Sequence, residues 1–187
     1  ETSMEPFLQE FAQKHGLYLD KRGKRPARKG NKVSWTDLYG NKHDLDFVLE
    51  RGGSDTRIGI PVAFIETAWR RYTKHSRNKA QEIQGAILPL AEKYRWNNPF
   101  LGTVLAGVFT ESSLDQLRSL GFQVLYFPYE SLVVAFQSEE IDIAFDEGTP
   151  DHVFRQTTKR IENASPEQMD RIRTHLVVAN QAAINSF

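Results

Sequence analysis

The sequence predicts an α/β domain with a mixed central sheet flanked by helices and with a helical C-terminal appendage. Apolar runs of strand length alternate with segments of helical periodicity in the middle of the chain, and this alternation is typical of a sheet covered by helices. The last third of the chain is mostly helical in pattern. At 187 residues the chain fits one domain, with a core over about residues 5–127 and the appendage over about 128–187.

The N-terminal elements are a short helix and a basic loop. Residues 6–15 place Phe7, Leu8 and Phe11 on one side at helical spacing, and Gly16 is a stop signal. Residues 21–32 carry seven Lys and Arg side chains among Gly and Pro, so we expect an exposed loop.

A hairpin and a buried strand come next. The pattern predicts strands over 33–38 and 43–50, joined by the turn at Gly40 and Asn41. A glycine-rich turn then leads into the continuous apolar strand 58–65, a composition typical of a strand buried on both faces, with Glu66 at its end.

Helices and strands alternate in the remainder of the core. A helix is predicted around residues 80–94, with Pro89 expected to kink or break it near its end. The other predicted elements are, in order, a strand over 103–109, a helix from a Thr110, Ser112 or Ser113 cap to Leu120, and a strand over 123–127.

The C-terminal part gives weaker patterns. Residues 131–136 fit a helix or a strand, and residues 141–145 predict a strand. Residues 153–161 and 166–183 predict helices.

Composition narrows the classes of protein. With no cysteine, the chain has no disulfides, no thiolate zinc site and no cysteine nucleophile, which fits a reducing compartment. No apolar run approaches the length of a membrane span and no signal-peptide pattern is present, so we expect a cytoplasmic protein without a membrane partner. Residues 1–80 carry 16 Lys and Arg against 10 Asp and Glu, whereas residues 81–187 carry 8 against 14. This segregation favours a polyanion-binding face in the first part, although solvated charge runs are the alternative.

Two acidic residues on neighbouring predicted strands are the strongest functional signal. Asp46 interrupts an apolar strand, where a carboxylate is unfavourable unless something binds it, and Glu66 ends the next strand. Carboxylates on rigid strands beside a basic segment suit a hard cation such as Mg²⁺ acting on a phosphate. Asp44 points to the same strand face as Asp46 and is a further candidate ligand. The alternative for each acid is a solubilising residue at a strand end.

This arrangement resembles the PD-(D/E)XK nuclease superfamily, whose fold is restriction-endonuclease-like. The matching residues are Asp46 in HDLDFVLE, Glu66 in VAFIETAW and the helical segment that follows, in the shared order helix, hairpin, strand, helix, strand over about residues 5–127. The resemblance implies that Asp46, Glu66 and the backbone carbonyl of Thr67 bind Mg²⁺, with Mn²⁺ as a substitute.

The sequence departs from the family pattern at Ala68, where the resemblance implies a lysine that orients or activates the attacking water. Three explanations are open. The cation has moved to the following helix, the protein is a binding-only relative, or Ala68 is an introduced substitution. We favour a moved cation, and Lys74 is the candidate catalytic residue, with Arg70 and Lys79 also available.

Two cationic groups are candidates for DNA phosphate contacts, because neutralised phosphates release counterions. The candidates in the basic segment 21–32 are Lys24, Arg25, Arg28 and Lys29. The candidates that follow Glu66 are Arg70, Arg71, Arg77 and Lys79. The alternative for the first group is a flexible, solvated loop.

The resemblance implies a Mg²⁺-dependent endonuclease that hydrolyses phosphodiester bonds of double-stranded DNA, in the manner of a type II restriction enzyme. Because one site cuts one strand, double-strand cleavage implies a homodimer. The alternatives are a non-catalytic DNA-binding module on the same fold and a repair or junction-processing nuclease.

Overall fold

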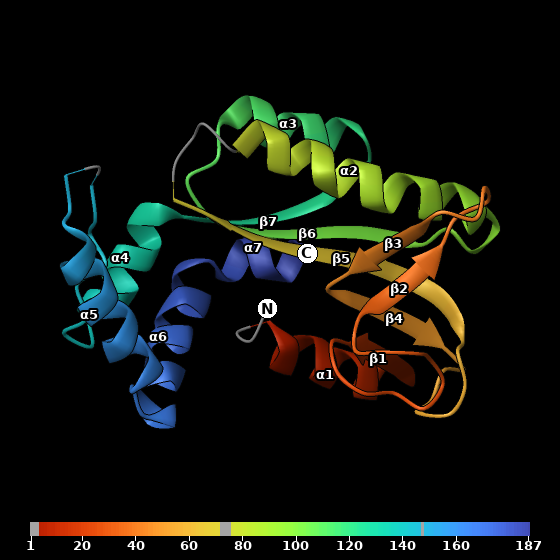
Figure 1. Cartoon of the computed structure of the whole chain (residues 1–187), viewed down its shortest axis with the longest axis horizontal. Coiled ribbons are helices and arrows are strands. Elements are labelled where there is room, and N and C mark those ends of the chain that lie inside the picture. The colour runs from red at the N-terminus through yellow and green to blue at the C-terminus, as the bar shows by residue number, and fades with distance from the viewer. Residues whose placement is uncertain (1–3, 72–75, 147) are drawn as a thin grey trace.

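A five-stranded mixed sheet forms the centre of the protein in a computed structural model, which describes residues 4–71, 76–146 and 148–187 (Figure 1). The strand order is β1-β4-β5-β6-β7, and the strands are β1 (Leu17–Lys21), β4 (Phe47–Arg51), β5 (Ile60–Arg70), β6 (Phe100–Gly107) and β7 (Gln123–Pro128). β1, β4 and β5 are antiparallel neighbours, whereas β5, β6 and β7 run parallel. The predicted mixed α/β sheet is therefore confirmed.

Helices cover both faces of this sheet (Figure 1). On one face, α2 (Ser76–Lys93) and α3 (Glu111–Ser119) pack over Phe64 of β5 and Leu105 of β6. On the other face, α1 (Glu5–Lys14) packs over Ile65 of β5 and Val104 of β6, and α7 (Gln181–Ser186) lies on the same side. Because side chains alternate along a strand, residues 66 and 68 of β5 face α2, and residues 67 and 69 face the α1 side.

The N-terminal helix is confirmed, but β1 is an element that the sequence analysis did not predict. β1 is a five-residue edge strand, and it pairs with β4 from Leu17 opposite Arg51 to Lys21 opposite Phe47. It is short and runs directly into the basic segment, so its alternating pattern has little length in which to appear.

The predicted hairpin is present, but its second strand breaks at Asp46. β2 (Val33–Thr36) and β3 (Lys42–Leu45) form a separate two-stranded sheet, and β4 begins only at Phe47. The prediction of one continuous strand over 43–50 is therefore wrong at one residue. The Asp46 side chain binds the backbone of Thr67, and the chain bends where it does so.

β5 is longer than the sequence indicated. It continues to Arg70 rather than ending at Glu66, because pairing with β6 extends to Arg70 opposite Gly107. α2 also runs through Pro89 to Lys93, so of the predicted kink or break, the break is wrong. Proline in the last turn removes one helical donor and leaves the preceding turns intact.

The predicted strand 123–127 and the helix before it are confirmed. The Thr110 side chain accepts a hydrogen bond from the backbone N–H of Ser113 and so caps α3, and Gly121 takes the left-handed conformation after the helix with a φ of 86°.

The C-terminal appendage is helical, as predicted. It consists of α4 (Tyr129–Gln137), α5 (Asp151–Glu162), α6 (Pro166–Ala179) and α7. The predicted strand over 141–145 is wrong, because these residues form no strand, and Ile141 and Ile143 instead pack with α4 and α6 in a small separate core. Phe187 reaches back to the central sheet, where its ring meets Phe100 at 5.3 Å. Within the described ranges, none of the helices is long and apolar enough to cross a membrane.

Candidate metal centre

Asp46 and Glu66 meet where β4 and β5 separate. The last paired residues of these strands at this end are Phe47 and Ile65. One residue farther, the backbone hydrogen bonds between the strands are replaced by hydrogen bonds to the carboxylates of Asp46 and Glu66. The N–H and hydroxyl of Thr67 donate to Oδ2 of Asp46 at 2.7 and 2.6 Å, and the N–H of Asp46 donates to Oε1 of Glu66 at 3.2 Å. Two acids 20 residues apart in sequence are thus held together.

The Thr67 carbonyl points to the open edge of β5. In a strand, the N–H and C=O of one residue point to the same side, and those of its neighbours point to the other. The Thr67 N–H is directed toward Asp46, whereas the Arg70 carbonyl accepts from Val108 at 2.7 Å on the β6 side. The alternation therefore directs the Thr67 carbonyl to the same side of β5 as its N–H, which is the side that β4 has left.

We call the place where β4 and β5 separate, with Asp46, Glu66 and Thr67, the fork. Its oxygen ligands fit a small, hard divalent cation. Asp46 is half-buried and Glu66 is only 8% exposed. Both supply carboxylate oxygens, and the Thr67 carbonyl is directed to the side of β5 that β4 has left. In the described part of the chain, no three His, Cys, Asp or Glu side chains gather as a candidate metal site. Mg²⁺ needs no such group, since proteins commonly bind it through one or two carboxylates, with waters and substrate phosphates completing the shell. Asp46, Glu66 and Thr67 are the residues that would hold it.

Thr67 is the residue of this site whose side chain the sequence analysis overlooked. Its hydroxyl and N–H both hold one oxygen of Asp46, so they orient the carboxylate. The available signal was a hydroxyl side chain directly after Glu66, which is too common in strands to be specific.

Ala68 leaves this face of β5 without a cation at the position where the family pattern has lysine. It lies two residues from Glu66, so its side chain points to the same face, and it packs against the core under α2. Arg70 lies two residues farther along the same face. Arg70 and Lys79 both approach Glu82 of α2, at 3.9 and 3.2 Å.

The other cationic candidates that follow Glu66 do not gather at one place. Lys74 lies outside the described residues. Arg77 is exposed on α2. Arg71 turns toward the C-terminal appendage, where its Nη2 donates to the backbone oxygen of Asp146 at 2.7 Å.

The basic segment 21–32 is only partly exposed, so the prediction of an exposed loop is wrong in part: Lys21 belongs to β1, and Arg25 and Arg28 turn inward. Arg25 is 4% exposed and pairs with Glu50 and Asp20, and Arg28 pairs with Asp20 at 3.2 Å. These guanidinium groups are engaged inside the protein and do not face a DNA phosphate. Lys24 and Lys29 are exposed, as predicted.

Asp44 lies apart from the fork. It is exposed, it pairs with Lys32 at 2.6 Å, and this hydrogen bond lowers the pKa of Asp44 below its usual value. Asp44 therefore does not join Asp46 and Glu66.

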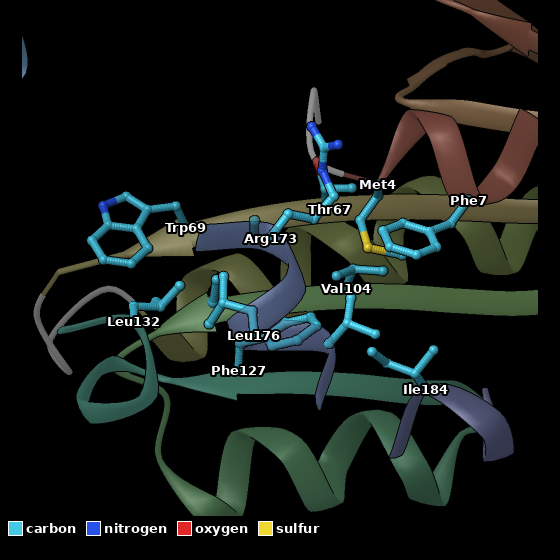
Figure 2. A pocket seen from close by; sticks show the side chains of 13 residues that line it. Met4, Phe7, Thr67, Trp69, Val104, Phe127, Leu132, Arg173, Leu176 and Ile184 are labelled. Carbon is cyan, nitrogen blue, oxygen red and sulfur yellow. The ribbon is translucent and has the colours of Figure 1, made fainter. Parts of the chain in front are cut away.

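A pocket lies on the α1 side of the sheet, with Thr67, Trp69 and Val104 in its lining (Figure 2). It encloses about 440 Å³ and is mostly apolar, with Met4, the residue before α1, and Phe7 of α1 at one end and Trp69 with Leu132 at the other. None of the described residues that line it is Asp or Glu, so the candidate metal chemistry stays at the fork.

Gly107 fixes the end of β5 against β6. Its φ is 96°, and a Cβ there would lie 2.1 Å from the Arg70 carbonyl oxygen. We expect Gly107→Ala to lower the free energy of unfolding by about 1–3 kcal/mol, through backbone strain and this clash. Urea denaturation measures the change. Gly85→Ala in α2, where a Cβ meets nothing within 4 Å, is the control and should stabilise by up to about 1 kcal/mol. Equal stability of the Gly107 variant and the parent would contradict this role.

Comparisons with known proteins leave the family open. No family model matches the sequence, and no curated protein matches it. A solved structure described as the crystal structure of a protein of unknown function, AF1548, is similar over 97% of this chain and 96% of that one, at 12% identity and a TM-score of 0.41.

Proposed function

We propose that the protein is a divalent-metal-dependent DNA endonuclease of the PD-(D/E)XK kind, resembling a type II restriction enzyme. The observation that carries the proposal is the fork, where the Asp46 N–H bonds Glu66 and Thr67 bonds the Asp46 carboxylate just past the last β4–β5 pair. The element order supports it in part, because α1, β5, α2 and β6 occur in the order of the family that the sequence resembles, with β1 to β4 between α1 and β5.

The chain's own residues divide the work at this site. Thr67 holds Asp46 in one orientation by two hydrogen bonds, and the burial of Glu66 limits its motion. A bound Mg²⁺ or Mn²⁺ would polarise the phosphodiester and lower the pKa of the attacking water. A cation from residues 70–79, for which Lys74 is our candidate, stabilises developing negative charge in place of the lysine missing at position 68.

The substrate of this proposal is double-stranded DNA. The exposed Lys24, Lys29 and Arg77 are available for phosphate contacts, and Arg70 and Lys79 lie on the Glu66 face of the sheet. A homodimer supplies the second site that double-strand cleavage requires.

Incubation of supercoiled plasmid with the purified protein tests the activity. We expect nicked and linear DNA with Mg²⁺ or Mn²⁺ and intact plasmid with a chelator. The competing function is a non-catalytic DNA-binding module, which Ala68 favours. A protein that retards DNA on a gel but never cuts it with either metal would establish that function instead.

Lys74→Ala tests the moved cation. We expect cleavage to fall about 10²–10⁴-fold, the usual effect of removing a group that assists proton transfer, while DNA affinity changes little. Lys24→Ala, at an exposed cation of the 21–32 segment, is the matched control and should affect affinity alone. An equal loss of cleavage and affinity in Lys74→Ala would reject the role.

A further inference from the structure

A second pocket lies at the end of β5, where the appendage meets the sheet. It encloses about 280 Å³ between β5, the start of α4, the segment around Phe145, and α5. Its lining is rich in aromatic side chains. The residues that matter here are Trp69, Arg71, Tyr129, Phe145, Phe154 and Thr157.

Two aromatic residues of this pocket are exposed, and the others are half-buried. Trp69 is 46% exposed and Phe154 is 40% exposed. The rings form two tilted pairs, Trp69 with Tyr129 at 6.0 Å and Phe145 with Phe154 at 5.1 Å between centroids. Exposed ring faces of this kind stack on planar heterocycles, and they do so with little dependence on the base.

Arg71 adds a fixed cation to the aromatic wall. Its guanidinium carbon lies 5.2 and 5.0 Å from the ring centroids of Phe145 and Phe154, and the bond to the Asp146 carbonyl holds it there. A guanidinium beside aromatic rings stacks on bases or donates to their carbonyl and ring-nitrogen edges. The hydroxyl of Thr157 supplies a further polar group in the lining.

The position of the pocket relates it to the fork. Trp69 lies three residues beyond Glu66 on the same strand, which corresponds to about 10 Å at a rise of about 3.3 Å per residue. That distance equals about three stacked nucleotide steps of roughly 3.4 Å each. The Trp69 side chain lies on the opposite face of the sheet from Glu66. A DNA strand bound at the fork would therefore pass around the edge of β5 that β4 leaves open in order to reach the Trp69 ring.

We propose that this aromatic pocket receives one unstacked nucleobase of the DNA strand bound at the fork. The inference rests on the proposed DNA endonuclease function and adds a recognition element to it. The volume suits a single heterocycle, since it falls just below the range of about 300–1,000 Å³ for sites of larger ligands. A mismatched base is cheaper to unstack, so a mismatched duplex should bind more tightly than a matched one.

Titration with free nucleosides tests the pocket without any phosphodiester. The chain has three Trp residues, so a ¹H–¹⁵N spectrum contains three indole N–H signals, and Trp69→Phe identifies the Trp69 signal. We expect adenosine and cytidine to shift this signal and ribose 5-phosphate to leave it unchanged. Trp35, which is buried, and Trp96, which is 86% exposed, report non-specific effects and should not move. A Trp69 signal unmoved by every nucleoside overturns the proposal.

Oligonucleotide affinity gives the second measurement. Trp69→Ala should weaken binding of a mismatched duplex about 5- to 140-fold, the effect of losing one base–aromatic stack, and should abolish the preference for the mismatch. Trp96→Ala should keep both. A Trp69 shift in a protein that never cuts DNA rejects the endonuclease and keeps the pocket. Cleavage with unchanged affinity in Trp69→Ala and no shift rejects the pocket alone.

Discussion

Glu66→Gln and Asp46→Asn are each expected to reduce Mg²⁺-dependent cleavage of DNA at least about 1,000-fold. The reason is the lost negative charge, which weakens binding of the metal. A bound divalent cation lowers the activation free energy by several kcal/mol, and each 1.36 kcal/mol corresponds to about tenfold in rate. Both amides keep an acceptor oxygen for the existing partners, the Asp46 N–H in one case and Thr67 in the other. Initial rates of plasmid nicking measure the effect.

Asp44→Asn is the matched control for these variants. It removes the same charge two residues from Asp46, at an exposed side chain that pairs with Lys32 outside the fork. We expect its cleavage rate to stay within about a factor of three of the parent, a change of about 0.6 kcal/mol. Thermal unfolding and DNA retardation of all three variants show that fold and binding persist. Unchanged cleavage in either fork variant would remove the metal centre from the proposal.

Arg25→Met is expected to lower the free energy of unfolding by about 3–5 kcal/mol, because it leaves a buried carboxylate without its partner. The Arg25 guanidinium bonds both oxygens of Glu50, at 2.5 and 2.9 Å, and their side chains are 2% and 0% exposed. Arg25 also donates to the backbone oxygens of Ser54 and Arg57, so it ties the basic segment to the turn after β4.

The surroundings of Arg25 explain why this cation stays charged. Burial alone would lower the pKa of Arg25, but the hydrogen bond and charge of Glu50, with the charge of Asp20, outweigh it and raise the pKa. The Tyr18 ring stacks on the guanidinium at 4.2 Å, and burial and a hydrogen bond to Asp55 raise the pKa of Tyr18 to about 12. Tyr18 therefore remains a neutral phenol against the cation at physiological pH.

Chemical denaturation of Arg25→Met measures its cost. Lys24→Met, one residue away at an exposed cation, should stay within about 0.5 kcal/mol of the parent. The double variant Arg25→Met with Glu50→Leu should recover part of the loss, because it leaves no single charge buried at the pair. If Arg25→Met lowered the free energy of unfolding by less than about 1 kcal/mol, the Arg25–Glu50 pair would stabilise the protein no more than a surface ion pair does, and the prediction would be wrong.

Local patterns predicted most of the elements and the two acids at the fork. The apolar strand ending near Glu66, the helix around Ile83 and the cap at Thr110 depend on neighbours within a few residues, and such signals can be read along the chain. Asp46 could be singled out because a carboxylate inside an apolar strand needs a partner. The structure supplies that partner as Thr67.

Other features required contacts between distant residues. The bend at Asp46 depends on Thr67, and the four residues by which β5 exceeds its predicted end depend on β6. Arg25 is a surface cation by composition, and only Glu50, 25 residues away, makes it a buried one.

The sequence by itself determined the alternation of strands and helices and the presence of two acids on successive strands, since each follows from short-range periodicity and side-chain chemistry. Only the tertiary structure decided which cations face solvent, where the strands separate and which backbone atoms stand beside the acids. These choices depend on pairing register and on burial against distant partners, and a one-residue change in register would turn each side chain to the other face of the sheet.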